Sequence, residues 1–237
     1  MKSLMQRALG EDWNRLPAVL QTHYRFGASS EVGELDIEYP RFMQAYLRLL
    51  RAFGALTHRS GRLVPTVVDK SVVGDRWYWR RTLTYPDGKV VRFDSFWVGA
   101  DDNQIIEFVN PVLGLQMAPR VEDGRLHYRG VRFVVRLGPL FLPVPEWLVL
   151  GRTTIVEEAL DDAHFAMDFR LTHPLLGRVF RYAGKFEVAD GQSPSACGGS
   201  AIGTAGSDPR PSAHPGPPIR LPRATPIAWS ARADPDQ

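Results

Sequence analysis

Cysteine is almost absent from this chain of 237 residues. A single cysteine, Cys197, cannot form an intrachain disulfide, which excludes a small secreted domain stapled by such bonds. Residues 1–12 also lack the apolar core of a secretory signal. This pattern is typical of a protein from a reducing compartment, and we expect a cytoplasmic location.

Long apolar runs are missing too. Because a membrane-spanning helix needs about 18 or more consecutive apolar residues, we expect no transmembrane segment. The most apolar stretch, residues 137–150, contains Pro139, Pro143 and Pro145, which exclude a continuous helix or a central strand there. Two interpretations stay open for it: a buried connection between strands, or a mobile apolar loop that covers a pocket or touches a membrane.

The chain also lacks a large excess of charge of either sign. The net charge is +3 at pH 7, and only four of the basic residues are lysines, namely Lys2, Lys70, Lys89 and Lys185. The basic residues are mixed with acidic ones, whereas a nucleic-acid surface needs a basic stripe on one face. We therefore expect no binding to nucleic acid.

The common sequence motifs of catalytic, metal-binding and nucleotide-binding sites are absent. The chain has no glycine-rich phosphate loop, dinucleotide fingerprint, zinc-binding His-Glu-x-x-His motif, cysteine pair or nucleophile elbow. The six histidines show no metal-ligand spacing. We expect neither a metal site nor a cofactor, and the sequence favours a binding protein over an enzyme.

Local patterns divide the chain into two parts. Residues 191–237 are rich in proline and glycine and predict a disordered tail, so residues 1–190 are expected to form a single globular domain. Helices are expected within residues 15–54, where two stripes have helical spacing. The first stripe is Leu16, Val19, Leu20 and Tyr24, and the second is Phe42, Tyr46, Leu49, Leu50 and Phe53.

From about residue 63 to 188 the apolar period is two, which predicts eight or nine strands joined by short turns. Strands connected in this way pair antiparallel with their neighbours. The expected fold class is therefore α+β, with N-terminal helices followed by an antiparallel meander that forms a curved sheet or a barrel.

The clearest predicted hairpin turns at residues 86–88, and one charge lies on its apolar face. Arg81 alternates in phase with Trp77, Trp79, Leu83 and Tyr85. A buried guanidinium must be paired. Its candidate partners are Asp94, Glu107, Glu157 and Asp168.

Two interpretations of Arg81 stay open. It is structural, either in an ion pair or with its charged head extended to a rim, or it anchors an anionic group such as a carboxylate or phosphate in a cup lined by aromatic residues. The second interpretation predicts an apolar or amphipathic, lipid-like small molecule as the ligand. The predicted ligand-binding residues are Arg81, Trp79, Phe93, Ser95, Trp97 and Tyr182.

Four segments resemble a known family. They are RLPAVLQTHY at 15–24, GDRWYWRR at 74–81, LPVPEWL at 142–148 and THPLLGRVFRYAG at 172–184. Together they resemble the bacterial domain of unknown function numbered 4166, over about residues 13–188. The resemblance implies a bacterial origin and a domain sometimes joined to NAD(P)-binding oxidoreductase domains, but no activity or catalytic residues. This chain lacks a dinucleotide-binding half, so a redox role would need a separate partner chain.

Three functions follow as hypotheses. The first is a small-molecule-binding module. The second is an enzyme that uses a carboxylate in the same cup, such as Glu157 or Asp168, as a base. The third is an interaction domain that docks on an NAD(P)-dependent oxidoreductase through exposed strand edges or residues 137–150.

Overall fold

The computed structural model describes residues 1–52, 54, 56–138 and 140–188. The predicted disordered tail, residues 191–237, lies outside this part of the chain. None of the helices in the described residues is long and apolar enough to cross a membrane.

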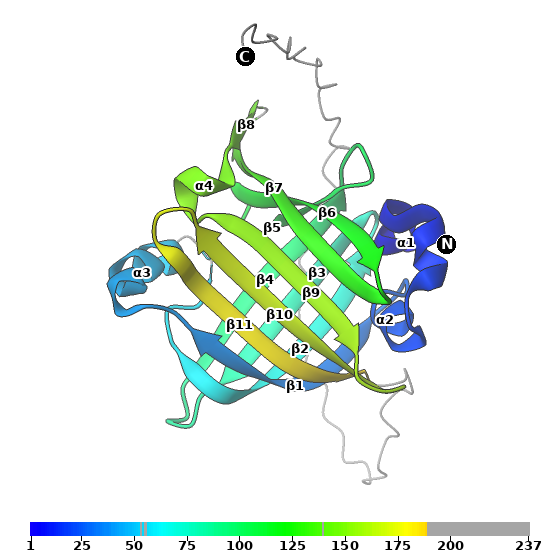
Figure 1. Cartoon of the computed structure of the whole chain (residues 1–237), viewed down its shortest axis with the longest axis horizontal. Coiled ribbons are helices and arrows are strands. Elements are labelled where there is room, and N and C mark those ends of the chain that lie inside the picture. The colour runs from blue at the N-terminus through cyan, green and yellow to red at the C-terminus, as the bar shows by residue number, and fades with distance from the viewer. Residues whose placement is uncertain (53, 55, 139, 189–237) are drawn as a thin grey trace, which may run out of the picture. The chain divides into compact units, whose positions relative to one another are not determined.

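Eleven antiparallel strands make up most of the described chain (Figure 1). They are β1 (Ser29–Glu38), β2 (Gly61–Val73), β3 (Arg76–Thr84), β4 (Val90–Gly99), β5 (Ile105–Phe108), β6 (Leu113–Glu122), β7 (Arg125–Leu137), β8 (Leu140–Val144), β9 (Arg152–Ala159), β10 (His164–His173) and β11 (Gly177–Val188). Strand β1 pairs with both β2 and β11, while β6 pairs with β7 and β7 with β9. Ten strands therefore close into a barrel, and β8 pairs with β7 alongside it.

The predicted antiparallel barrel is confirmed, but the predicted number of strands was too low. Strand β1 lies inside the region predicted to be helical, and β8 forms within the apolar stretch 137–150. The interior positions of β1 include Glu31 and Gly33, so it lacks the apolar alternation that marks a strand. Strand β8 carries Pro143 at the end of the sheet order, where a missing N–H costs no ladder hydrogen bond.

The helices lie around the openings of the barrel. They are α1 (Leu4–Leu9), η1 (Gly10–Arg15), α2 (Ala18–His23), η2 (Arg41–Met43), α3 (Gln44–Ala52) and α4 (Glu146–Val149). A capping box starts α1, since Ser3 Oγ accepts from the N–H of Gln6 at 3.0 Å and Gln6 Oε1 accepts from the N–H of Ser3 at 2.7 Å. In Figure 1, α1 and α2 lie on the opposite side of the barrel from α3.

The first predicted helical stripe is confirmed, and the second is right only at the buried Leu50 and the half-buried Tyr46. All four residues of the first stripe are buried. In the second helix the buried residues are Met43, Leu47 and Leu50, while Phe42 and Leu49 are exposed. The first turn of that helix is 3₁₀, and its tighter winding changes which residues share a face. The predicted Phe53 lies outside the described residues.

Because neighbouring strands are antiparallel, their connections alternate between the two openings of the barrel. The segments 1–28, 74–75, 100–104, 123–124 and 160–163 form what we call the α2 end. The described residues within 39–60, 85–89, 109–112, 138–151 and 174–176 form the α3 end.

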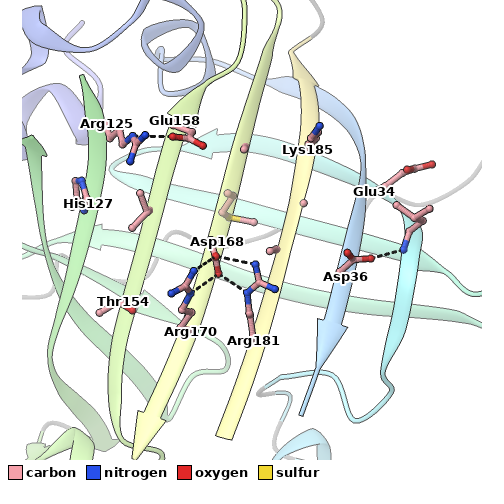
Figure 2. Close-up of a pocket in the computed structure, with 16 residues that line it drawn as sticks. Glu34, Asp36, Arg125, His127, Thr154, Glu158, Asp168, Arg170, Arg181 and Lys185 are labelled. Carbon is pink, nitrogen blue, oxygen red and sulfur yellow. Dashed lines mark hydrogen bonds and ion pairs between the residues drawn. The ribbon is translucent and has the colours of Figure 1, made fainter. Parts of the chain in front are cut away.

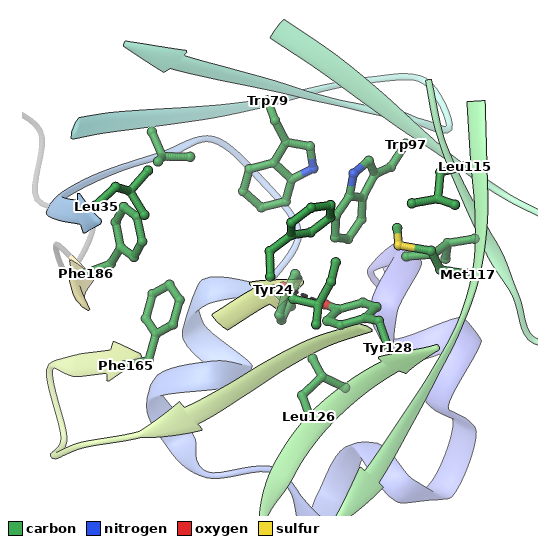
Figure 3. Packing of buried hydrophobic residues seen from close by; sticks show 14 of the residues in the cluster. Tyr24, Leu35, Trp79, Trp97, Leu115, Met117, Leu126, Tyr128, Phe165 and Phe186 are labelled. Atoms are coloured by element: carbon green, nitrogen blue, oxygen red, sulfur yellow. Dashed lines mark hydrogen bonds between the residues drawn. The ribbon is translucent and has the colours of Figure 1, made fainter. Parts of the chain in front are cut away.

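Aromatic side chains fill much of the barrel interior (Figure 3). Tyr24, at the end of α2, packs against Trp97 with ring centroids 6.1 Å apart, and Trp97 contacts Trp79 at 5.2 Å. Full burial of such a ring stabilises the fold by about 1.5–3 kcal/mol. This cluster therefore holds the end of α2 against β3 and β4.

The seam between β1 and β11 depends on a residue without a side chain. A Cβ at Gly184 would collide with the backbone oxygen of Glu34 and lie 2.8 Å from Leu35 Cδ2. We expect Gly184→Ala to destabilise the fold by about 2 kcal/mol, because the strands must separate to admit the methyl group. Thermal unfolding tests this against Gly99→Ala, where a Cβ meets no atom within 4 Å. Equal midpoints for the two variants would contradict the tight seam.

Candidate functional site

Two small cavities adjoin each other inside the barrel. Each has a volume of about 40 Å³. Residues bordering both cavities are Val68, Arg81, Met167, Tyr182 and Phe186. The first cavity has polar groups in its wall and lies against the last turn of α2, whereas the second is lined by apolar side chains such as Leu83 and Phe180 and reaches Leu56 and Thr57 of the α3 end.

Arg81 forms a buried ion pair between the two cavities. Its Nη2 lies 3.2 Å from Glu107 Oε1, and its Nη1 donates to Ser95 Oγ at 2.9 Å. Ser95 in turn donates to Glu107 Oε1 at 2.6 Å. The side chains of Arg81 and Glu107 are only 13% and 11% exposed, so each neutralises the other's charge in a region of low dielectric.

The structure selects one of the four predicted partners of Arg81. Glu107 is that partner, while Asp94 is exposed on β4. Asp168 binds Arg170 and Arg181 on the outside of the barrel. Glu157 lines the same cavity as Arg81 but bonds to tyrosine.

All six predicted ligand-binding residues meet in the interior. Trp79, Trp97, Arg81 and Tyr182 line the first cavity, and Phe93 lines the second together with Arg81 and Tyr182. Ser95 supports the guanidinium of Arg81. Their role in binding a ligand stays a prediction.

A chain of hydroxyl groups ends on the carboxylate of Glu157. Tyr128 Oη donates to Tyr24 Oη at 2.6 Å, and Tyr24 Oη lies 2.8 Å from both carboxylate oxygens of Glu157. Burial raises the pKa of Glu157 to about 7, and the nearby His23 and the hydrogen bond from Tyr24 only partly oppose this. Burial also raises the pKa values of both tyrosines, so their hydroxyls stay protonated and act as donors.

Sequence reasoning had named Glu157 but had missed both tyrosines. Tyr128 follows Leu126 in the buried phase of β7, so its alternation was a usable signal. Tyr24 comes from a helix, and 133 positions separate it from Glu157. No local sequence pattern predicts a contact between residues so far apart in the chain.

The end of α2 is held to the barrel by a second polar group. Lys70 Nζ donates to the carbonyl oxygens of His23 at 2.6 Å and Arg25 at 2.9 Å. Burial lowers the pKa of Lys70 to about 8. His23 Nδ1 lies 2.6 Å from Glu31 Oε1, which places this carboxylate at the wall of the first cavity.

Within the described part of the chain, three buried polar atoms of residues that line the first cavity have no protein partner. They are the indole Nε1 atoms of Trp79 and Trp97 and the Oε2 atom of Glu31. A buried donor or acceptor left unpaired costs about 1–3 kcal/mol, so nearly all such groups in folded proteins find a partner. The three side chains that carry these atoms all line the first cavity, and between them they hold two unpaired donors and one unpaired acceptor.

A larger groove lies on the outer face of β1, β11, β10 and β9, with a volume of about 680 Å³ (Figure 2). Asp168 at its centre accepts from Arg170 Nε and Arg181 Nε, each at 3.0 Å. Burial would raise the pKa of Asp168, but these two arginines outweigh it and lower the value to about 2. The charges at the centre of the groove are therefore paired with one another, and we take the smaller interior cavities as the candidate site.

Metal ligands do not gather in the described part of the chain: no three of its His, Cys, Asp and Glu side chains are placed to hold an ion.

No curated protein matches the chain. The sequence profile of a domain of unknown function, DUF4166, matches residues 16–186, which include α2, the barrel strands except the last two residues of β11, and all the residues that line both cavities. Because this match covers most of the chain, the protein belongs to the DUF4166 family.

Proposed function

We propose that this protein binds a compact amphipathic small molecule inside its barrel. An oxygen-bearing group occupies the first cavity and an apolar body the second. The observation that carries this proposal is the set of unpartnered buried atoms on Trp79, Trp97 and Glu31. A hydroxyl group satisfies both kinds of atom, because it accepts from an indole N–H and donates to a carboxylate.

The charges of the interior favour an uncharged ligand. Arg81 is already neutralised by Glu107, and Glu31 and Glu157 also border the first cavity. An anionic ligand would meet these carboxylates without a free countercharge. We therefore propose a hydroxyl or carbonyl group at this position rather than the carboxylate or phosphate that the sequence suggested.

The cavity volumes favour a compact ligand over a long-chain lipid. Two volumes of about 40 Å³ are together smaller than the cavity of about 150 Å³ that accommodates benzene. Binding therefore requires side chains at the boundary to turn aside. Met167 borders both cavities and has the flexible, unbranched side chain suited to such a change.

Titration with cyclohexanol, followed by the indole N–H resonances in NMR spectra, tests this proposal. We expect saturable shifts of the resonances of Trp79 and Trp97, with the exposed Trp147 as an internal control that does not move. Cyclohexanecarboxylate should bind about tenfold more weakly, because its charge is unmatched in the interior. Shifts confined to Trp147, or no saturable shift up to the solubility limit, would contradict the proposal.

Glu157 favours a second candidate function, an enzyme that moves a proton in the same cavity. Its pKa of about 7 populates both the carboxylate and the acid near neutral pH, as a general acid–base group requires. Exchange of the protons next to the carbonyl of cyclohexanone for deuterium in D₂O is a direct assay. Exchange that is lost in Glu157→Gln would favour this candidate, and exchange no faster than in buffer would count against it.

A further inference from the structure

The two ends of the barrel differ in exposed apolar surface. Among the described residues, nine large hydrophobic side chains are exposed within the segments of the α3 end, against three at the α2 end. The most prominent are Leu140, Trp147, Leu148 and Leu175, with Leu175 88% exposed. Scattered apolar residues need no explanation, but a concentration at one end marks an interaction surface.

The charges of the two ends are opposite. The α3 end carries five basic residues, Arg41, Arg48, Arg51, Arg59 and Lys89, against the acidic Asp87 and Glu146. The segments of the α2 end carry four basic and eight acidic residues. The α3 end is therefore positive and the α2 end negative.

Few acidic groups oppose the arginines of the α3 end. Within the part of the chain that the structure describes, Arg41, Arg48 and Arg51 form no ion pair, while Arg59 pairs with Asp87. Burial and the charges of Arg51, Arg48 and Arg59 lower the pKa of His58. The positive charges of these three arginines therefore act on the same region of the α3 end, around His58.

The apolar and basic groups lie on adjoining segments. Tyr46 Oη of α3 donates to the carbonyl oxygen of Val149, just after Trp147 and Leu148, at 3.3 Å. Trp147 and Pro174 line one surface hollow, so α4 lies close to the turn between β10 and β11. Figure 1 shows β8 projecting beyond the barrel on the same side as α4.

We propose that the α3 end docks on the surface of an anionic lipid bilayer. Its apolar side chains occupy separate projections, namely the β7–β8 turn, α4 and the β10–β11 turn, rather than one groove shaped for a peptide. Leucine and tryptophan at such tips enter the headgroup region, and nearby arginines bind the negative surface. The docking does not depend on whether the interior cavities hold a ligand.

Flotation of the full chain with lipid vesicles tests the docking. We expect binding to vesicles of phosphatidylcholine that contain phosphatidylglycerol, weaker binding to phosphatidylcholine alone, and a decrease with salt. The double variants Trp147→Ser/Leu148→Ser and Arg48→Gln/Arg51→Gln should each bind at least about tenfold more weakly.

Matched controls come from the α2 end. Phe26→Ser removes an apolar side chain of segment 1–28 that is 42% exposed, and Arg7→Gln removes an exposed charge of the same segment. Both should bind vesicles as the unchanged protein does, and thermal unfolding should show that every variant is folded. Equal losses in controls and α3-end variants, or no vesicle binding by the unchanged chain, would overturn the proposal. Binding to soluble polyglutamate but not to vesicles would also overturn it, in favour of an acidic protein partner.

Discussion

Replacing Glu157 with glutamine is expected to make the fold more stable at pH 8 and to flatten its pH dependence between about pH 4.5 and 7. The pKa of this carboxyl rises from 4.5 to about 7 on folding, chiefly through burial. In that window the folded protein binds a proton that the unfolded chain does not, so stability falls as pH rises. The favourable contribution is complete below the unfolded pKa and is lost above the folded one.

The size of this effect follows from the shift. Each pKa unit corresponds to about 1.4 kcal/mol, so the change amounts to about 3 kcal/mol across the window. Glutamine has nearly the same shape and still accepts from Tyr24, but it carries no charge to bury. Lys70 does not affect this window. Its pKa falls from 10.5 to about 8 on folding, so its contribution makes the free energy of unfolding increase with pH only between about pH 8 and 10.5.

Chemical unfolding at several pH values measures the effect. Glu158→Gln is the matched control, since Glu158 is the next residue on β9 and makes an exposed ion pair with Arg125 at 2.8 Å. The control should keep the pH dependence of the unchanged protein. A Glu157→Gln variant with the same dependence would show that Glu157 is not buried as described.

Replacing Arg81 with leucine is expected to destabilise the fold by about 3–5 kcal/mol, because it leaves Glu107 buried without its countercharge. Adding Glu107→Gln should recover part of this loss, since the second change removes the unpaired charge. The double variant should therefore be more stable than Arg81→Leu alone.

Unfolding free energies of the two single variants and the double variant measure this coupling. Additive losses would mean that Arg81 and Glu107 do not depend on each other. The coupling also means that Arg81→Leu tests ligand binding poorly. Trp79→Phe and Trp97→Phe are better probes, because they remove indole donors and leave the ion pair in place.

Part of the interior was predictable from the sequence because β3 and β4 alternate regularly. The pairs Trp79–Ser95 and Arg81–Phe93 lie opposite each other on the inner face, as their phase indicated. Glu107 was one of four candidates for Arg81, since charge alone cannot rank partners on strands whose register is unknown. Local pattern thus gave the face of each residue but not its neighbour across the barrel.

Other parts could not be predicted for identifiable reasons. Strand β1 places Glu31 and Gly33 inside, so its interior phase looks polar. The unpartnered indole atoms become visible only when burial and hydrogen bonds are known. The extent of the domain, the bacterial origin, the cytoplasmic location and the oxidoreductase partner stay predictions.

Native mass spectrometry of the full chain, purified gently from cells, tests most directly whether the barrel holds a ligand. We expect a discrete added mass of a small organic molecule on the intact protein, reduced in the double variant Trp79→Phe/Trp97→Phe and retained in Trp147→Phe. Fragmentation of the added mass would identify the molecule. A bare polypeptide mass in every preparation, or an added mass that the double variant retains in full, would contradict a ligand site at these indoles.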